Sequence, residues 1–500
     1  MDVQATAKVS NRLFMLLFAV LLIIMLYNAF GERVYHNNGN GWDGAVYTDM
    51  VKKMPEVIYN NTISSFYYQR ILPSFLCYAS LRVVGVETSD INVLHFFIVF
   101  NIILILISVF VYTRIAKLLS FNSYTFIAGF VLLFYNFSVL KMSMYDPVKT
   151  DYLAFLEGLL ISYFYLKKNF IALLITAICS LFTFPTVIFL SSIFLILFDK
   201  DVKATMSDIK PAVIKYLLPL LLASIPVLLT FYSYKYNFVK FDFARATDGA
   251  TMSWVDTKER LSMLLSIIML VFVLFVFYKA MILYVKDILN FRGFTYYKAG
   301  VMVLIFIVAN VLIKKLCDVN APNPNSFADF LYRICYQALV YPLGSYIAHF
   351  IYFGSVIILL FLRFKKVISS IGNLGKGFVV FLGLNLILMI GSESRQFIYV
   401  IPFITVAILY AMNEELNGNK LLLFVLIIIN LTFSFFWYQI NLPDVQMEVG
   451  SQKAFPQQRY FGFQGPWVSR NTYYIHLLFT IACFAATKYV LDRRNVRRLL

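Results

Sequence analysis

Four short polar clusters interrupt an otherwise apolar chain, and their side chains are of the kinds that transfer protons and bind phosphate. The clusters occupy residues 41–49, 67–73, 145–151 and 392–396. A carboxylate can act as a general base toward an attacking hydroxyl, and a guanidinium group presents a fork of donors to phosphate oxygens. The clusters therefore predict acid–base or phosphate chemistry.

Asp43 is the candidate general base in the first cluster. It stands beside Trp42 and close to Tyr47, so its carboxylate would meet a substrate among aromatic rings. The pair Asp43-Gly44 is also a common turn, in which the carboxylate bonds the backbone instead. The sequence leaves both interpretations open.

Arg70 and Arg395 are the candidate phosphate ligands. Arg395 precedes a predicted span whose helix dipole would favour an anion, and Glu393 is placed to orient it. Each arginine has an alternative role as an anchor whose long side chain reaches the lipid headgroups.

The third cluster contains a helix-start signal. Asp146 followed by Pro147 is typical of an N-cap and a first helical position, and a helix N-terminus also attracts anions. If a helix begins there, Glu157 lies about three turns deeper, at ~16 Å, on the same face. An acidic residue within a span is costly, so Glu157 is either functional or paired with a neighbouring helix.

The elements that must position these clusters are membrane helices. Of 500 residues, 61% are hydrophobic and only 14% are charged, whereas about a quarter of a soluble protein is charged. Runs apolar enough to cross ~30 Å of hydrocarbon lie at 13–30, 93–112, 123–140, 152–166, 214–234, 261–285, 300–313, 345–362, 377–391, 397–411, 421–439 and 474–490. The run 169–198 is interrupted at Phe184-Pro185, which predicts two short helices. We expect an all-α polytopic transmembrane bundle of about 12–14 spans, with residues 1–500 as one domain.

The distribution of charge predicts the orientation. With the N-terminus inside, the inner segments carry 24 of 43 basic and 8 of 26 acidic residues. This net charge of +16, against +1 outside, favours cytoplasmic termini. The long polar segments then lie outside, at 31–92, 235–260, 314–344 and 440–473, and residues 71–86 are expected to form an interfacial helix.

Three further features argue against other interpretations of the chain. The basic residues are scattered between apolar runs rather than gathered in a stripe, so we expect no nucleic-acid partner. The five cysteines and four histidines are far apart, so no thiol or imidazole metal site is predicted. Residues 13–30 lack a following small-residue cleavage site and are interpreted as a retained span rather than a signal peptide.

The layout resembles the GT-C class of integral membrane glycosyltransferases. The resemblance rests on Asp43 in a large first outer loop, on interfacial helices from Tyr67 to Val86, and on the string Tyr-Gln-Arg-Ile-Leu-Pro at 68–73. It extends to Asp146-Pro147 in the next outer loop, and to Glu393 and Arg395 before the span that contains Pro402. The N-terminal 200 residues carry it best, and the remainder is similar only in topology.

The resemblance implies a polyprenyl-phosphate-linked sugar as donor and a glycan, lipid or protein acceptor, in a bacterial inner membrane. Asp43 would be the base of an inverting transfer, and Arg70, Arg395, Tyr47 and Glu393 would bind the substrate and its phosphate. Asp146 and Glu157 would position the acceptor or a metal. Carboxylates with phosphate suit Mg²⁺ or Mn²⁺, although members of the class also work without metal. The sugar, the acceptor and the oligomeric state are left open.

Two other functions fit parts of the sequence. A lipid-linked polysaccharide polymerase would use the same arginines but would not need Asp43. A transporter or flippase predicts inverted repeats, broken helices and several intramembrane charges. The sequence shows no repeat and one clear intramembrane acid, Glu157.

Overall fold

The fold is taken from a computed structural model of the chain. It describes residues 3–198, 212–235, 257–284, 296–318, 321, 338, 341–391, 393–442, 461 and 470–499. These residues form helices and no strand, which confirms the all-α prediction. The predicted outer segments 235–260, 314–344 and 440–473 fall largely outside the described residues.

The helices follow one another along the chain without an intervening strand in the described residues. Those of the first 200 residues are α1 (Val3–Ala29), η1 (His36–Gly39), α2 (Trp42–Lys52), α3 (Met54–Tyr59), α4 (Ser65–Tyr68), α5 (Ile71–Val84), α6 (Asp90–Leu118), α7 (Ser123–Phe134), η2 (Ser138–Met142), α8 (Ser143–Tyr145), α9 (Asp151–Leu166), α10 (Phe170–Ser180) and α11 (Pro185–Ile196). The later ones are α12 (Ala212–Lys235), α14 (Thr257–Met281), η3 (Ile282–Tyr284), α16 (Tyr296–Leu316), α18 (Gly344–Phe353), α19 (Ser355–Ile371), η4 (Gly372–Leu374), α20 (Lys376–Leu388), η5 (Ser394–Phe397), α21 (Ile401–Leu416), α22 (Lys420–Phe433) and α24 (Arg470–Leu499).

Every predicted apolar run contains a helix, but the helices differ in length. Within the described residues, five are long and apolar enough to cross a membrane, and seven if each of two bent pairs counts as one span. The five belong to α1, α6, α14, α16 and α24. The chain is therefore an integral membrane protein by composition and helix length. The count of 12–14 spans stays a prediction, because several of the other helices have only 11 to 14 residues.

Proline and glycine set two of the helix breaks. The run 169–198 forms two helices, as predicted, because Pro185 begins α11 and the residue before a proline disfavours helical backbone; Phe184 is extended at φ −149°. The predicted run 345–362 is not one straight helix: α18 and α19 meet at a bend of 120°, and whether they form one broken span stays open. Gly354 adopts φ +71° at the corner, and Asn430 Oδ1 accepts the Ser355 N–H at 3.2 Å, which caps the start of α19.

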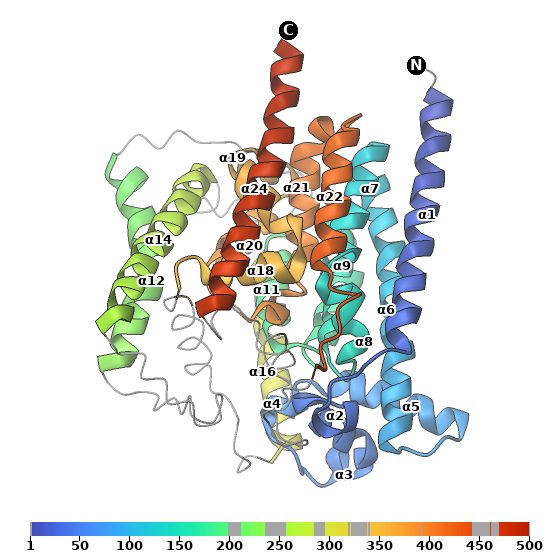
Figure 1. Ribbon diagram of the computed structural model, residues 1–500. Helices are drawn as coiled ribbons and strands as arrows, with labels where there is room; N and C mark the ends of the chain where they lie inside the picture. The colour runs from blue at the N-terminus through green and yellow to red at the C-terminus, as the bar shows by residue number, and fades with distance from the viewer. Residues whose placement is uncertain are drawn as a thin grey trace.

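The two chain ends lie at the same end of the bundle, and the first-loop helices lie at the other end. In Figure 1, α1 begins and α24 ends at the top, whereas α2, α3, α4 and α5 lie together at the bottom. The termini are therefore on one side, as the charge pattern predicts. Which side is cytoplasmic remains a prediction from that pattern.

Close packing of α9 on the later half of the chain joins the elements that carry the polar clusters. Gly158 in α9 has no side chain at the contact, where a Cβ would lie 2.3 Å from the backbone oxygen of Tyr399. The segment between η5 and α21 therefore touches the backbone of α9 directly. This contact fixes the position of the 393–396 turn relative to the start of α9.

Candidate active site

Asp43 lies in the first turn of α2, so its interpretation as a residue of an Asp-Gly turn is wrong. Gly41 precedes the helix at φ +74°, a conformation that favours glycine, and gives the chain the sharp entry that starts α2 at Trp42. A carboxylate in a first helical turn also faces the positive end of the helix dipole. These local features turn the Asp43 side chain toward the polar clusters of the later chain.

The turn at 393–396 places Arg395 against Asp43. Arg395 Nη2 lies 3.0 Å from Asp43 Oδ2, and Arg395 Nε lies 2.9 Å from Glu393 Oε1. Gln396 donates to the other Glu393 oxygen at 2.5 Å. One guanidinium thus bridges two carboxylates, and Glu393 orients it. Arg395 occupies the short helix η5 rather than the first turn of α21, so the predicted help from a span's dipole is wrong.

The buried His349 holds the turn at 393–396 through hydrogen bonds. His349 in α18 is fully buried, its Nε2 lies 2.9 Å from the backbone oxygen of Met389, and its Nδ1 lies 2.9 Å from Ser394 Oγ. Because a carbonyl can only accept, Nε2 carries the proton and Nδ1 accepts from the serine hydroxyl. His349 therefore connects the end of α20 to the residue beside Arg395. No sequence signal singled it out, since its partners are 40 and 45 residues away.

Asp146 is not a helix N-cap, because α9 begins five residues later, at Asp151. Asp146 is 1% exposed, forms an ion pair with Lys149, and accepts no other hydrogen bond from the described part of the chain. Asn101 of α6 holds this loop by donating to the backbone oxygens of Ser143 and Pro147 at 2.9 and 3.0 Å. The Asp146 carboxylate reaches Gly41, where a Cβ would lie 2.5 Å from its Oδ1.

Asp151 is a site residue that the candidate list omitted. It is 4% exposed and interacts electrostatically with Arg395, Lys149, Asp146 and Asp43. Its position at the end of the 145–151 cluster was the available signal. The structure therefore gathers carboxylates and cations from three of the four clusters at one place.

Arg70 brings in the fourth cluster. Its guanidinium carbon lies 3.8 Å from the ring centre of Phe66, and its Nη1 donates to the backbone oxygen of that residue at 2.6 Å. Within the described chain it forms no ion pair, yet it contributes to the electrostatic environment of Asp43 and Tyr47. Arg70 is thus a partly buried cation near these carboxylates that has no ion-pair partner among the described residues.

The electrostatics leave Asp43 ionised and Tyr47 neutral. Burial raises the pKa of Asp43, but the nearby Arg395, Lys149 and Arg70 outweigh it, so the pKa lies below its ordinary value. Burial raises the pKa of Tyr47 well above its usual range. Tyr47 lies edge-on to Tyr67, with ring centres 6.1 Å apart, and lines the space between α2 and α4.

Glu157 does not share a helix face with Asp146, because the two residues are not on the same helix. Glu157 lies six residues into α9, about 9 Å below Asp151. It is 2% exposed, and its Oε1 accepts a hydrogen bond from Thr183 at 2.8 Å, in the corner between α10 and α11. Glu157 is placed to join helices below the site.

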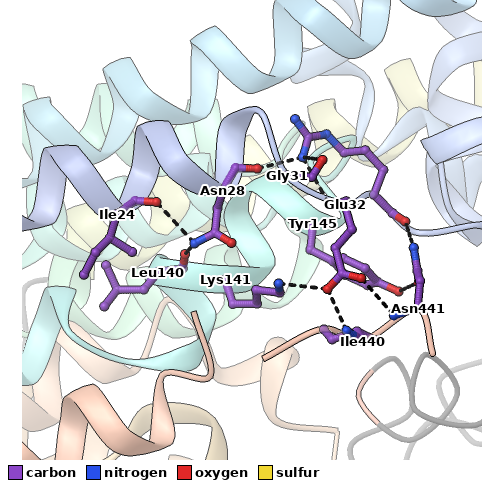
Figure 2. Close-up of polar contacts among 10 residues, drawn as sticks. Ile24, Asn28, Gly31, Glu32, Leu140, Lys141, Tyr145, Ile440 and Asn441 are labelled. Atoms are coloured by element: carbon purple, nitrogen blue, oxygen red, sulfur yellow. Dashed lines mark hydrogen bonds and ion pairs between the residues drawn. The ribbon is translucent and has the colours of Figure 1, made fainter. Parts of the chain in front are cut away.

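A second network holds the 145–151 loop from the opposite side (Figure 2). Lys141 Nζ lies 2.9 Å from Glu32 Oε1, and the Glu32 oxygens accept from the backbone N–H of Asn441 and of the residue before it, at 2.8 and 2.6 Å. Tyr145 donates to Asn441 Oδ1 at 2.8 Å. Tyr145, the residue before Asp146, is thus tied to the segments that follow α1 and α22. The sequence signal for this ion pair was that Glu32 and Lys141 stand directly after the predicted spans 13–30 and 123–140.

The carboxylates of the site do not fit a divalent cation. Asp43 faces Arg395, Asp146 faces Lys149, and Arg70 lies near both tyrosines. Among the described residues, no group of three or more His, Cys, Asp or Glu side chains is placed to hold a metal ion. Because each of these carboxylates already faces a cation, Mg²⁺ or Mn²⁺ would meet repulsion here. We derive no step through a metal.

With this geometry in place, the chain was compared with known proteins. No family model, curated protein or solved structure matches it. The arrangement of the side chains is therefore the evidence on which a function must be argued.

Proposed function

We propose that this chain is a membrane glycosyltransferase of the GT-C type. It would transfer a sugar from a polyprenyl-phosphate donor to a hydroxyl or amide acceptor at the end of the bundle that carries α2–α5. The observation that carries the proposal is the ion pair between Asp43 and Arg395, which are 352 residues apart in the chain. This contact supports the proposal because an ionised carboxylate can serve as a base and the guanidinium one hydrogen bond away is of the kind that binds phosphate.

Two arginines at this place suit a departing phosphate. Arg70 forms no ion pair with the described residues, and of its guanidinium nitrogens only Nη1 donates a hydrogen bond there, so the guanidinium retains N–H groups for phosphate oxygens. Arg395 already binds Asp43 and Glu393, and a phosphate of higher charge would compete for it. As Arg395 turns to the phosphate, Asp43 loses its partner and becomes a stronger base. Donor binding and base activation are coupled in this way.

The transfer step balances without a covalent enzyme intermediate. The acceptor oxygen or nitrogen attacks the anomeric carbon from the face opposite the phosphate, and a new bond to the sugar forms. The bond between that carbon and the phosphate oxygen breaks, and its electron pair leaves with polyprenyl phosphate beside Arg70. Asp43 accepts the acceptor proton. A single displacement of this kind inverts the anomeric centre.

The test is transfer from a radiolabelled polyprenyl-phosphate sugar in membranes, with expression and insertion verified for each variant. Asp43→Asn is expected to lose about 10²–10⁴-fold in rate, the usual contribution of a general base. Asp49→Asn is the matched control, because Asp49 is exposed on the same helix. Normal transfer by Asp43→Asn would contradict the proposal. Loss confined to Arg70 and Arg395 variants would favour a polysaccharide polymerase.

A transporter or flippase is the second candidate, because the structure contains bent helix pairs. The pairs Ser123–Phe134 with Ser138–Tyr145 and Gly344–Phe353 with Ser355–Leu374 are bent by 52° and 120°. Broken helices frequently line the substrate path of transporters. Proteoliposomes with a fluorescent lipid-linked sugar separate the two functions: a flippase moves the label between leaflets without an acceptor, whereas a transferase leaves it in place until an acceptor is added.

A further inference from the structure

A second polar site lies at the other end of the bundle, between α14, α19 and the end of α21. It is a cavity of about 600 Å³ lined by Phe272, Val273, Val276, Phe277, Phe361, Leu362, Arg363, Phe364, Lys365, Lys366 and Glu415. Glu415 stands at the far end of α21 from Arg395. A helix of 16 residues spans about 24 Å, so this cavity is separate from the candidate active site. Figure 1 shows α19 toward the end at which α24 finishes.

The polar wall of the cavity has an excess of positive charge. Arg363 Nε lies 2.8 Å and Lys366 Nζ 2.7 Å from the two Glu415 oxygens. One carboxylate thus faces two cations, and the exposed Lys365 adds a third. Two positive charges remain in excess among the described residues that line the cavity. The cavity therefore suits an anion, and a phosphodiester can accept from both lysines at once.

The remaining wall is apolar and opens toward the membrane. Of the eleven described residues that line it, seven are hydrophobic, and four of these are phenylalanines. Phe272 is 64% exposed, and Ile268 one turn before it is 55% exposed, so this face of α14 looks onto lipid. An inorganic anion would leave that wall without a partner. A molecule with a charged head and hydrocarbon chains satisfies both walls.

We propose that this cavity binds an anionic phospholipid from the leaflet at the end of the molecule where the chain termini lie. Its headgroup phosphate contacts Lys365 and Lys366. The parts of its acyl chains nearest the headgroup lie against the phenylalanines of α14 and α19. The lipid joins α14 to α19. This site is independent of sugar transfer, because it lies at the opposite end from Asp43.

The experiment compares lipids on the purified full-length protein in detergent. Binding of phosphatidylglycerol and of phosphatidylcholine with identical acyl chains is measured by native mass spectrometry and by the rise in unfolding temperature. Phosphatidylglycerol is expected to bind more tightly, by about fivefold for each lysine that contacts the headgroup. The double variant Lys365→Gln/Lys366→Gln is expected to lose this preference while Arg363 keeps Glu415 paired.

Controls separate the cavity from general surface charge and from free phosphate. Lys420→Gln/Lys488→Gln removes the same charge from exposed positions and is expected to keep the preference. Val276→Trp, which fills the apolar wall, is expected to weaken binding of both lipids. Equal binding of the two lipids, or a preference that survives in Lys365→Gln/Lys366→Gln, would overturn the proposal. Stabilisation by inorganic phosphate alone, equal to that by lipid, would also overturn it, since the site would then not need the acyl chains.

Discussion

Replacing Gly44 by alanine tests how the start of α2 is seated on the 145–151 loop. In an ordinary helix this substitution stabilises by about 1 kcal/mol, because alanine restricts the unfolded chain. At Gly44 the new Cβ would lie 2.8 Å from the backbone oxygen of Val148 and 3.1 Å from its Cβ. Backbone in a buried loop cannot yield easily, and overpacking of this kind costs about 1–3 kcal/mol. We therefore expect the sign of the effect to reverse.

Gly300→Ala supplies the comparison, because Gly300 lies in α16 with no atom of the described structure within 4 Å of an added Cβ. The two variants should differ by about 1–3 kcal/mol, the packing cost at Gly44, because the helix gain is common to both. The measurement is the apparent unfolding midpoint of each purified variant in the same detergent. A Gly44→Ala protein as stable as Gly300→Ala would refute the contact between α2 and Val148. In sugar transfer, Gly44→Ala should also be slow, because a shift of about 1 Å at a catalytic group costs about 10²-fold.

Three other predictions follow from the supporting contacts. Glu32→Gln leaves the buried Lys141, whose side chain is 5% exposed, without its charge partner. The free energy of unfolding should fall by about 3–5 kcal/mol, as measured by unfolding. Much of that loss should be recovered in Glu32→Gln/Lys141→Met. His349→Phe removes the two hydrogen bonds that His349 makes to Ser394 and Met389, which hold the turn beside Arg395. It should lower kcat more than it raises KM, and His349→Gln should restore part of the loss. Equal effects on kcat and KM would contradict a positioning role. Because the folded pKa of Asp43 lies below its ordinary value of 3.8, its ion pair stabilises the protein above that pH and is lost as pH falls through the folded pKa. The difference in unfolding midpoint between wild type and Asp43→Asn should stay constant from about pH 8 to 5 and shrink only below about pH 4; a change near neutral pH would show that the carboxylate is not held by Arg395.

The sequence predicted which side chains come together better than it predicted their backbone conformation. Asp43, Arg395 and Glu393 were chosen by type and by position in the predicted topology, and the structure puts them in contact. Asp146 and Glu157 were placed on one helix because Asp-Pro is a common helix start, but α9 begins at Asp151. The local pattern was outweighed by Asn101, which fixes the loop from 42 and 46 residues away. Sequence periodicity carries no information on contacts of that separation.

The helix breaks show the same limit. The break at Pro185 can be predicted from the sequence, because a proline restricts the backbone of the residue before it in any context. The corner at Gly354 has no such marker, since glycine is common within membrane helices. It depends on Asn430, which reaches it from α22 and caps the next helix. The bend that moves α18 beneath the 392–396 turn could be found only from the assembled structure.

The ion pair between Asp43 and Arg395 can form only late in the synthesis of the chain. Ribosomes add about 5–20 residues per second, so the 352 residues between the two partners take roughly 20–70 s to appear. During that time α2 and the 145–151 loop have emerged with Lys149 and Arg70 nearby, but the guanidinium that contacts Asp43 directly does not yet exist. A nascent or truncated chain would therefore hold the Asp43 carboxylate without its ion pair, and the contact between α2 and the 393–396 turn can form only after Arg395 has been added.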